Sequence, residues 1–158
     1  MNYRSISFRL SAWYSGIVAI TLGGLCLFAY LGLYKYMKAD LSSQLSDQAN
    51  QIATTWLREI SASGSDYVVS EIDEHVSPQI TNHFVRITKG DGSMLYQPKP
   101  PYDGSFDPAL VAASPPSAGF REEYPGGKEL LIYALRVDAD GGGSYTLEVG
   151  KAFEHIRR

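Results

Sequence analysis

The sequence predicts an α+β protein in which one N-terminal transmembrane helix continues into a long helix packed on a five-stranded antiparallel sheet. Three observations predict it. Residues 11–34 contain no charged side chain, residues 41–60 carry an apolar stripe with helical spacing, and residues 84–149 hold five short β-type runs separated by turn-forming residues. Together these patterns exclude a wholly cytosolic globule.

The uncharged stretch is long enough to cross a bilayer. A helix of 24 residues, at 1.5 Å per residue, spans about 36 Å, whereas a hydrocarbon core is about 30 Å thick. Trp13 and Tyr14 stand near one end of the stretch and Tyr30, Tyr34 and Tyr36 near the other, where amphipathic rings prefer the headgroup layer. We therefore expect contact with membrane lipid, a cytoplasmic tail over residues 1–10 and a transmembrane helix over residues 11–36.

Charge divides the chain at the same place. The first 39 residues carry four basic side chains and no acidic one, whereas the remainder carries ten basic and all 17 acidic side chains. Arg4, Arg9 and the α-amino group slightly outweigh Lys35 and Lys38, which favours a cytoplasmic N-terminus and an extracytoplasmic domain over residues 37–150. Because the domain is acidic and has no Lys/Arg cluster, nucleic acid is not expected as a partner.

The apolar stretch is expected to be retained as an anchor. The core of a cleaved signal is usually about 7 to 15 residues long, and this stretch is longer. Cys26 follows Leu25 where a lipoprotein acylation site needs a small residue, so an inert cysteine in lipid is the favoured interpretation over acylation. As the only cysteine, it leaves the exported part without a disulfide, a cysteine nucleophile or cysteine metal ligands.

The stripe after the membrane segment has two interpretations. It consists of residues spaced by three or four positions: Leu41, Leu45, Ala49, Ile52, Trp56 and Ile60. It could pack on the sheet of its own domain or form the seam of a parallel dimer. We expect a mixture, with a homodimer contact close to the membrane and packing on the sheet further along.

The rest of the domain reads as a short helix followed by strands. Residues 66–76 predict a second helix that ends before Pro78, and a short helix is expected from Asp107 to Ala113. Strands are predicted at residues 84–88, 94–96, 119–124, 130–137 and 144–149, the first two joined as a hairpin by a Gly-Asp-Gly turn. In the run 130–137 both alternating faces are apolar, which predicts a strand covered on both sides. Residues 151–158 are expected to begin another helix.

One candidate metal site stands out. Glu71 and His75 are four residues apart and would share a helix face, and His83 could complete a set of three ligands. A Glu/His pair at this spacing also forms on a solvated helix without any metal, which is the favoured interpretation. The two histidines could alternatively sense protons.

A candidate ligand site combines three arginines with a tyrosine: Arg86, Arg121, Tyr133 and Arg136. On the sheet these side chains could bind a small carboxylate or phosphate, although solvated positions would look the same. Catalytic residues and cofactors are not expected in this chain, because it has no Gly-x-Ser-x-Gly elbow, no phosphate-binding loop and no supported Ser/His/Asp set.

The chain resembles the N-terminal part of a bacterial two-component sensor histidine kinase. The resemblance lies in RSISFRL at residues 4–10 running into AWY at 12–14, in the hairpin over 84–96, and in YTLEVGK at 145–151. It implies a PAS-like (PDC-type) sensor domain in the periplasm, anchored in the inner membrane, with residues 151–158 leading to a second transmembrane span. The phospho-accepting helix and the ATP-binding domain are not in these 158 residues, so ATP and Mg²⁺ are expected only in a kinase core beyond them.

The implied function is that of an input module, which senses an unknown small ligand or ion and controls a kinase that acts on a response regulator. Two alternatives stay open. The same sensor could serve a chemoreceptor or a cyclic-dinucleotide enzyme, or the chain could be a single-span membrane-anchored interaction protein. The sequence beyond Arg158 would separate these readings.

Overall fold

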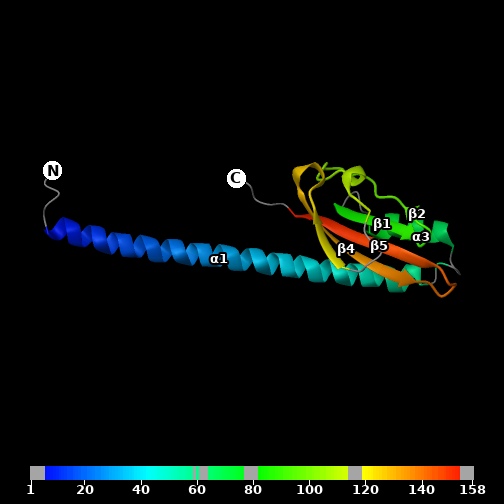
Figure 1. Cartoon of the computed structure of the whole chain (residues 1–158), viewed down its shortest axis with the longest axis horizontal. Coiled ribbons are helices and arrows are strands. Elements are labelled where there is room, and N and C mark those ends of the chain that lie inside the picture. The colour runs from blue at the N-terminus through cyan, green and yellow to red at the C-terminus, as the bar shows by residue number, and fades with distance from the viewer. Residues whose placement is uncertain (1–5, 59, 61–63, 77–81, 114–118, 154–158) are drawn as a thin grey trace. The chain divides into compact units, whose positions relative to one another are not determined.

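The chain forms two structural units, Met1–Leu41 and Ser42–Arg158. The computed structural model describes residues 6–58, 60, 64–76, 82–113 and 119–153 (Figure 1). The secondary structure is α+β, with a long N-terminal helix and a five-stranded antiparallel sheet. The predicted α+β class, with a long N-terminal helix and a five-stranded antiparallel sheet, is confirmed.

Helix α1 (Ile6–Ile52) is 47 residues long and supplies the whole described part of the first unit. Every side chain from Arg9 to Leu33 is exposed, and by length and composition the helix can cross a membrane. The hydroxyl of Thr21 donates to the carbonyl of Ile17 at 2.8 Å, so this polar group is satisfied within the apolar stretch.

Most of the stripe predicted after the apolar stretch is buried within the second unit. Leu45, Ala49 and Ile52 of α1 are at most 1% exposed. The π-helical segment η1 (Ala53–Leu57) follows directly, and the amide of Arg58 donates to the carbonyl of Ala53 at 3.1 Å, the i to i+5 bond of a π-helix. The wider turn explains why the adjacent residues Ile52 and Ala53 are both buried.

The predicted second helix is present in two parts. Helix α3 (Ser65–Glu71) is followed by the π-helical segment η2 (Ile72–Val76). Val68, Ile72 and Val76 are buried at four-residue spacing, so one face of this helix belongs to the core.

The five strands form one sheet in the order β2-β1-β5-β4-β3, with all neighbours antiparallel. Its strands are β1 (His83–Lys89), β2 (Met94–Tyr96), β3 (Gly119–Glu123), β4 (Glu129–Asp138) and β5 (Ser144–Phe153). All five predicted strands are thus confirmed. β5 lies at the centre, between β1 and β4 (Figure 1).

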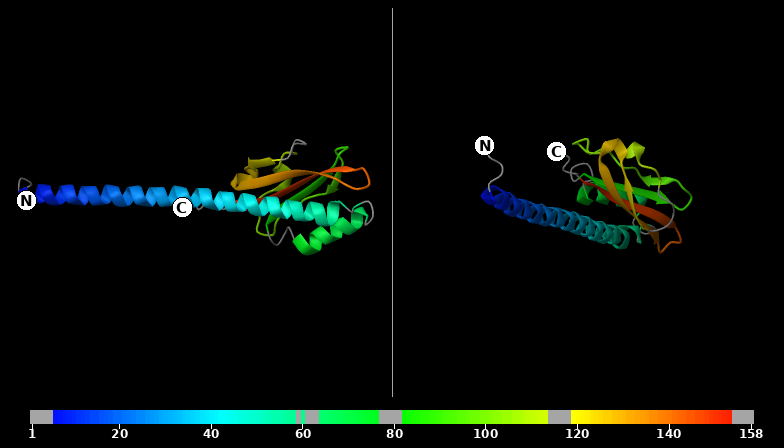
Figure 2. Two further views of the ribbon diagram at one scale, coloured as in Figure 1. Left: turned by 90° about the horizontal axis from the view of Figure 1, so that it is seen from below. Right: turned by 60° about the vertical axis from the view of Figure 1, so that its left-hand side comes forward.

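Each face of the sheet has its own cover. On one face, here called the helix face, Val85, Ile87, Leu147 and Val149 are fully buried, and the last part of α1 and α3 run along this side (Figure 2). On the opposite face, here called the loop face, Phe106 and Val111 from the segment 97–113 form a hydrophobic cluster with residues of the sheet, namely Phe84, Leu130 and Ile132. β4 is therefore covered on both sides, as its pattern predicts.

Two predicted helices need correction. Residues 151–153 belong to β5, because Lys151 pairs with His83 and Leu131, and Phe153 pairs with Glu129, whereas residues 154–158 lie outside the described part. The helix predicted from Asp107 to Ala113 is only one 3-10 turn, η3 (Pro108–Leu110). Its predicted cap is present, since Asp107 accepts a hydrogen bond from the amide of Ala109 at 2.9 Å.

Candidate functional site

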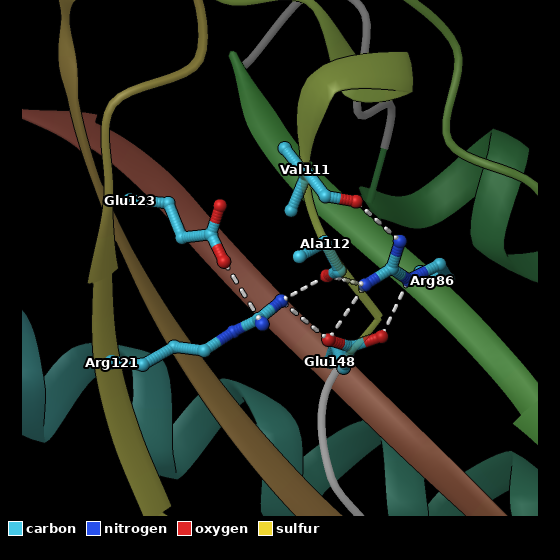
Figure 3. Close-up of polar contacts among 6 residues, drawn as sticks. All are labelled: Arg86, Val111, Ala112, Arg121, Glu123 and Glu148. Carbon is cyan, nitrogen blue, oxygen red and sulfur yellow. Dashed lines mark hydrogen bonds and ion pairs between the residues drawn. The ribbon is translucent and has the colours of Figure 1, made fainter.

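The loop face holds a buried ion pair between two neighbouring strands. Arg86 of β1 and Glu148 of β5 are register partners, so their side chains leave the same face of the sheet. Arg86 Nε lies 2.5 Å from Glu148 Oε2, and Arg86 Nη2 lies 2.9 Å from Oε1, which is a bidentate pair (Figure 3). The side chains are 7% and 2% exposed.

A second arginine joins the pair from β3. Arg121 Nη2 donates to Glu148 Oε1 at 2.9 Å, and Arg121 Nη1 lies 3.0 Å from Glu123 Oε1 (Figure 3). The cluster therefore contains two guanidinium groups and two carboxylates. Its formal charges cancel, which is what allows four ionised groups to lie so close to the core.

The same arginines fix the covering segment to the sheet. Arg86 donates to the carbonyls of Val111 at 3.1 Å and Ala112 at 2.6 Å, and Arg121 donates to the carbonyl of Ala112 at 2.7 Å (Figure 3). These bonds satisfy backbone acceptors that have no strand partner. The charge cluster thus connects β1, β3 and β5 to the segment 97–113 that covers them.

The predicted ligand residues separate into three environments. Arg86 and Arg121 do come together, but Glu148 takes the place between them that a ligand carboxylate would occupy. Tyr133 points to the helix face and stacks on Phe120, with ring centroids 4.6 Å apart. Arg136 is exposed and lies 3.8 Å from Asp138 on its own strand.

Glu148 is the residue that the sequence prediction missed. It lies between Leu147 and Val149, and alternation sends it to the face opposite these two buried residues. A lone carboxylate within an apolar strand is a signal that a cationic partner is needed. The partner could not be named from the sequence, because Arg86 is 62 positions away.

Two of the three predicted metal ligands lie side by side. His75 Nδ1 is 3.1 Å from Glu71 Oε2, and the His75 ring lies 6.0 Å from that of Trp56. His83 lies on β1 as the register partner of Lys151, whose cationic side chain is an unfavourable neighbour for a metal ion. Within the described ranges, no three His, Cys, Asp or Glu side chains gather as metal ligands do.

Asp73, close to the pair in sequence, joins η2 to the hairpin. Tyr96 donates its hydroxyl to Asp73 Oδ1 at 2.6 Å, and Lys99 Nζ lies 2.5 Å from Oδ2. Burial raises the pKa of the Asp73 carboxyl, but the hydrogen bonds from Lys99 and Tyr96 outweigh it and the pKa is lowered. Burial and the neighbouring Asp73 raise the pKa of Tyr96.

Burial, together with the positive charge of Lys151, lowers the pKa of His83 to about 4. Its Nδ1 atom is buried and has no hydrogen-bond partner among the described residues. His83 is therefore neutral in the folded chain at pH values where an unfolded histidine, with a pKa near 6.5, already binds a proton.

This difference predicts an acid-sensitive fold. Between about pH 6.5 and pH 4 the unfolded state binds more protons than the folded state, so the free energy of unfolding falls as pH falls, by at most about 1.4 kcal/mol per pH unit from this residue. Urea unfolding of the wild type and His83→Gln at pH 7 and pH 5 measures it. The variant should lose less stability than the wild type over this interval, and equal losses would contradict the role given to His83.

Two pockets of about 270 Å³ each flank the charge cluster on the loop face. One lies under the segment 97–113, between Arg86, Met94 and the prolines Pro98 and Pro100. The other opens beside Arg136, and we call it the Arg136 pocket. It is lined by Thr88, Lys89, Gly90, Gly92, Ala113, Arg136, Ser144, Tyr145, Thr146 and Glu148.

The chain matches no protein-family model, and comparison with curated proteins and with solved structures finds no significant match. Inferences about its function therefore depend on its own residues and their geometry.

Proposed function

We propose that the chain is the extracytoplasmic sensing and transmembrane signalling module of a two-component sensor histidine kinase in the bacterial inner membrane. The observation that carries the proposal is the continuity of α1. One unbroken helix contains both the exposed apolar stretch up to Leu33 and the residues Leu45, Ala49 and Ile52, which are buried in the folded domain. A change in the domain's packing thus acts on the same helix that has the composition of a membrane span.

The fold of the second unit supports a PAS-like sensor. A long helix, a hairpin, a loop and a three-stranded meander follow one another, and the hairpin and the meander meet along β1 and β5. The loop face carries pockets and a charge cluster, whereas the helix face is occupied by α1. Such a domain can place a stimulus on one side of the sheet and its signalling helix on the other.

Signalling in this proposal is a shift between two packings of the domain. A stimulus can shift the equilibrium only by its preference for one of them, and a change from 1:99 to 99:1 requires about 5.5 kcal/mol. Phosphoryl transfer to a response regulator, with ATP and Mg²⁺, belongs to the kinase core and uses no residue of this chain.

A homodimer is part of the proposal, but the whole stripe cannot form the contact between the two copies. Leu45, Ala49 and Ile52 are already buried within a single copy. The contact is therefore assigned to the part of α1 before Leu45, where Tyr36 and Met37 are exposed.

The membrane arrangement can be tested with alkaline phosphatase, which is active only after export. Fusions after Lys38 and after Gly127 should both be active in a bacterial host, because the charge distribution favours a cytoplasmic N-terminus. The matched control deletes residues 11–34, and its fusions should be inactive. Inactive fusions with the intact helix, at normal protein levels, would overturn the orientation.

A further inference from the structure

One side of the Arg136 pocket is lined by a row of polar side chains. Thr88, Thr146 and Arg136 are register partners on β1, β5 and β4, so their side chains leave the loop face side by side. Both threonines line the pocket together with Arg136. The pocket thus presents two hydroxyl donors and a guanidinium in one row.

The charge of the pocket favours an anion. Arg136 and Lys89 line it, and its one acidic lining residue among those described is Glu148. The carboxylate of Glu148 is already neutralised, since Oε2 accepts a hydrogen bond from Arg86 and Oε1 accepts hydrogen bonds from both Arg86 and Arg121. The positive charge of Arg136 is held only weakly by Asp138, because the pair is 3.8 Å apart and its side chains are 56% and 79% exposed.

The wall of the pocket is held by a close backbone contact. The amide of Gly90 donates to the carbonyl of Ser144 at 2.7 Å, and a Cβ at Gly90 would lie only 2.3 Å from the hydroxyl oxygen of Ser144. A side chain at this position would have to displace the Ser144 hydroxyl. The backbone hydrogen bond holds the hairpin turn against β5 without a ligand, and a pre-formed site binds with a smaller entropic penalty.

We propose that the Arg136 pocket binds the oxyanion group, carboxylate or phosphate, of a small ligand, with Arg136 and the hydroxyls of Thr88 and Thr146 as its donors. A guanidinium donates two parallel hydrogen bonds to such a group, and hydroxyls can rotate to donate to the remaining oxygens. A volume of about 270 Å³ is near the lower end of the range for ligand pockets, which suits a small ligand. The assignment rests on the proposed function and adds to it the chemical class of stimulus that the sensor would bind.

The test is an NMR titration of the full chain, ¹⁵N-labelled and held in phospholipid nanodiscs. Sodium phosphate and sodium succinate are added in separate experiments, with sodium chloride at equal ionic strength as the reference. The amides of Thr88, Gly90 and Thr146 should shift saturably with at least one oxyanion and not with chloride. Saturation with phosphate alone or with succinate alone identifies which oxyanion the pocket prefers.

Three variants locate the binding. Arg136→Gln should weaken the affinity at least tenfold and Thr146→Val several-fold, whereas Arg58→Gln, an exposed arginine outside the pocket, should bind as the wild type does. No saturable shift with either oxyanion would overturn the proposal, and so would wild-type affinity in Arg136→Gln. The titration involves no signalling output, so its failure is distinguishable from failure of helical signalling, which the proposed function requires.

Discussion

Replacing Glu148 with glutamine is expected to lower the free energy of unfolding of the second unit by about 3–5 kcal/mol. The Glu148 side chain is 2% exposed, and its carboxylate pairs with two arginines at once. Without its charge, the buried guanidinium of Arg86 has no counterion. The hydrogen bonds from Arg86 to the carbonyls of Val111 and Ala112 then lose the carboxylate that orients their donor. Urea unfolding followed by Trp56 fluorescence in a Trp13→Phe background measures the loss.

Two further variants separate charge from other effects. Glu122→Gln changes an exposed glutamate on β3 and should alter the stability by less than about 0.5 kcal/mol. The double variant Arg86→Met/Glu148→Leu should recover much of the loss, because apolar side chains of similar size can replace a buried ion pair. A Glu148→Gln protein within 1 kcal/mol of the wild type would show that the cluster is not electrostatically coupled.

The fold could be predicted largely because its core follows regular periods. Leu45, Ala49 and Ile52 recur at helical spacing and are buried. In the first half of β4, Leu130 and Ile132 on one face and Leu131 on the other are buried as well, as predicted for a strand covered on both sides. These are local patterns, so a single sequence is enough to recognise them.

The errors arise where long-range pairing outweighs local preference. Residues 151–158 follow a glycine and are predicted to begin a helix, yet hydrogen bonding between β5 and its two neighbours extends the strand to Phe153. The four candidate ligand residues lie in separate environments for a similar reason. Register decides that Tyr133 faces the helices while Arg86 and Arg121 meet at Glu148, and register across five strands cannot be read from alternation alone.

The second large effect is expected from changing the phase of α1. An α-helix has 3.6 residues per turn, so one residue inserted between Lys38 and Leu45 rotates the two parts of the helix by about 100° and separates them by a further 1.5 Å. Seven inserted residues make nearly two full turns and return the parts close to their original phase. In a protein that joins this chain to a kinase core, one inserted alanine should lock or invert the output, and seven residues should partly restore it.

A matched insertion outside the helix controls for added length. One alanine between Gly141 and Gly142, both exposed in the turn between β4 and β5, should leave the output nearly unchanged, because a surface turn absorbs length at a small entropic cost. All variants are compared at equal membrane levels. This control separates helical phase from a general effect of insertion.

Kinase output across this insertion series is the most direct test of the proposal that α1 carries the signal. The account predicts an altered output with one residue in α1, partial recovery with seven, and normal output with the insertion in the turn. Equal output from the one-residue and seven-residue helix variants would contradict rigid coupling through α1.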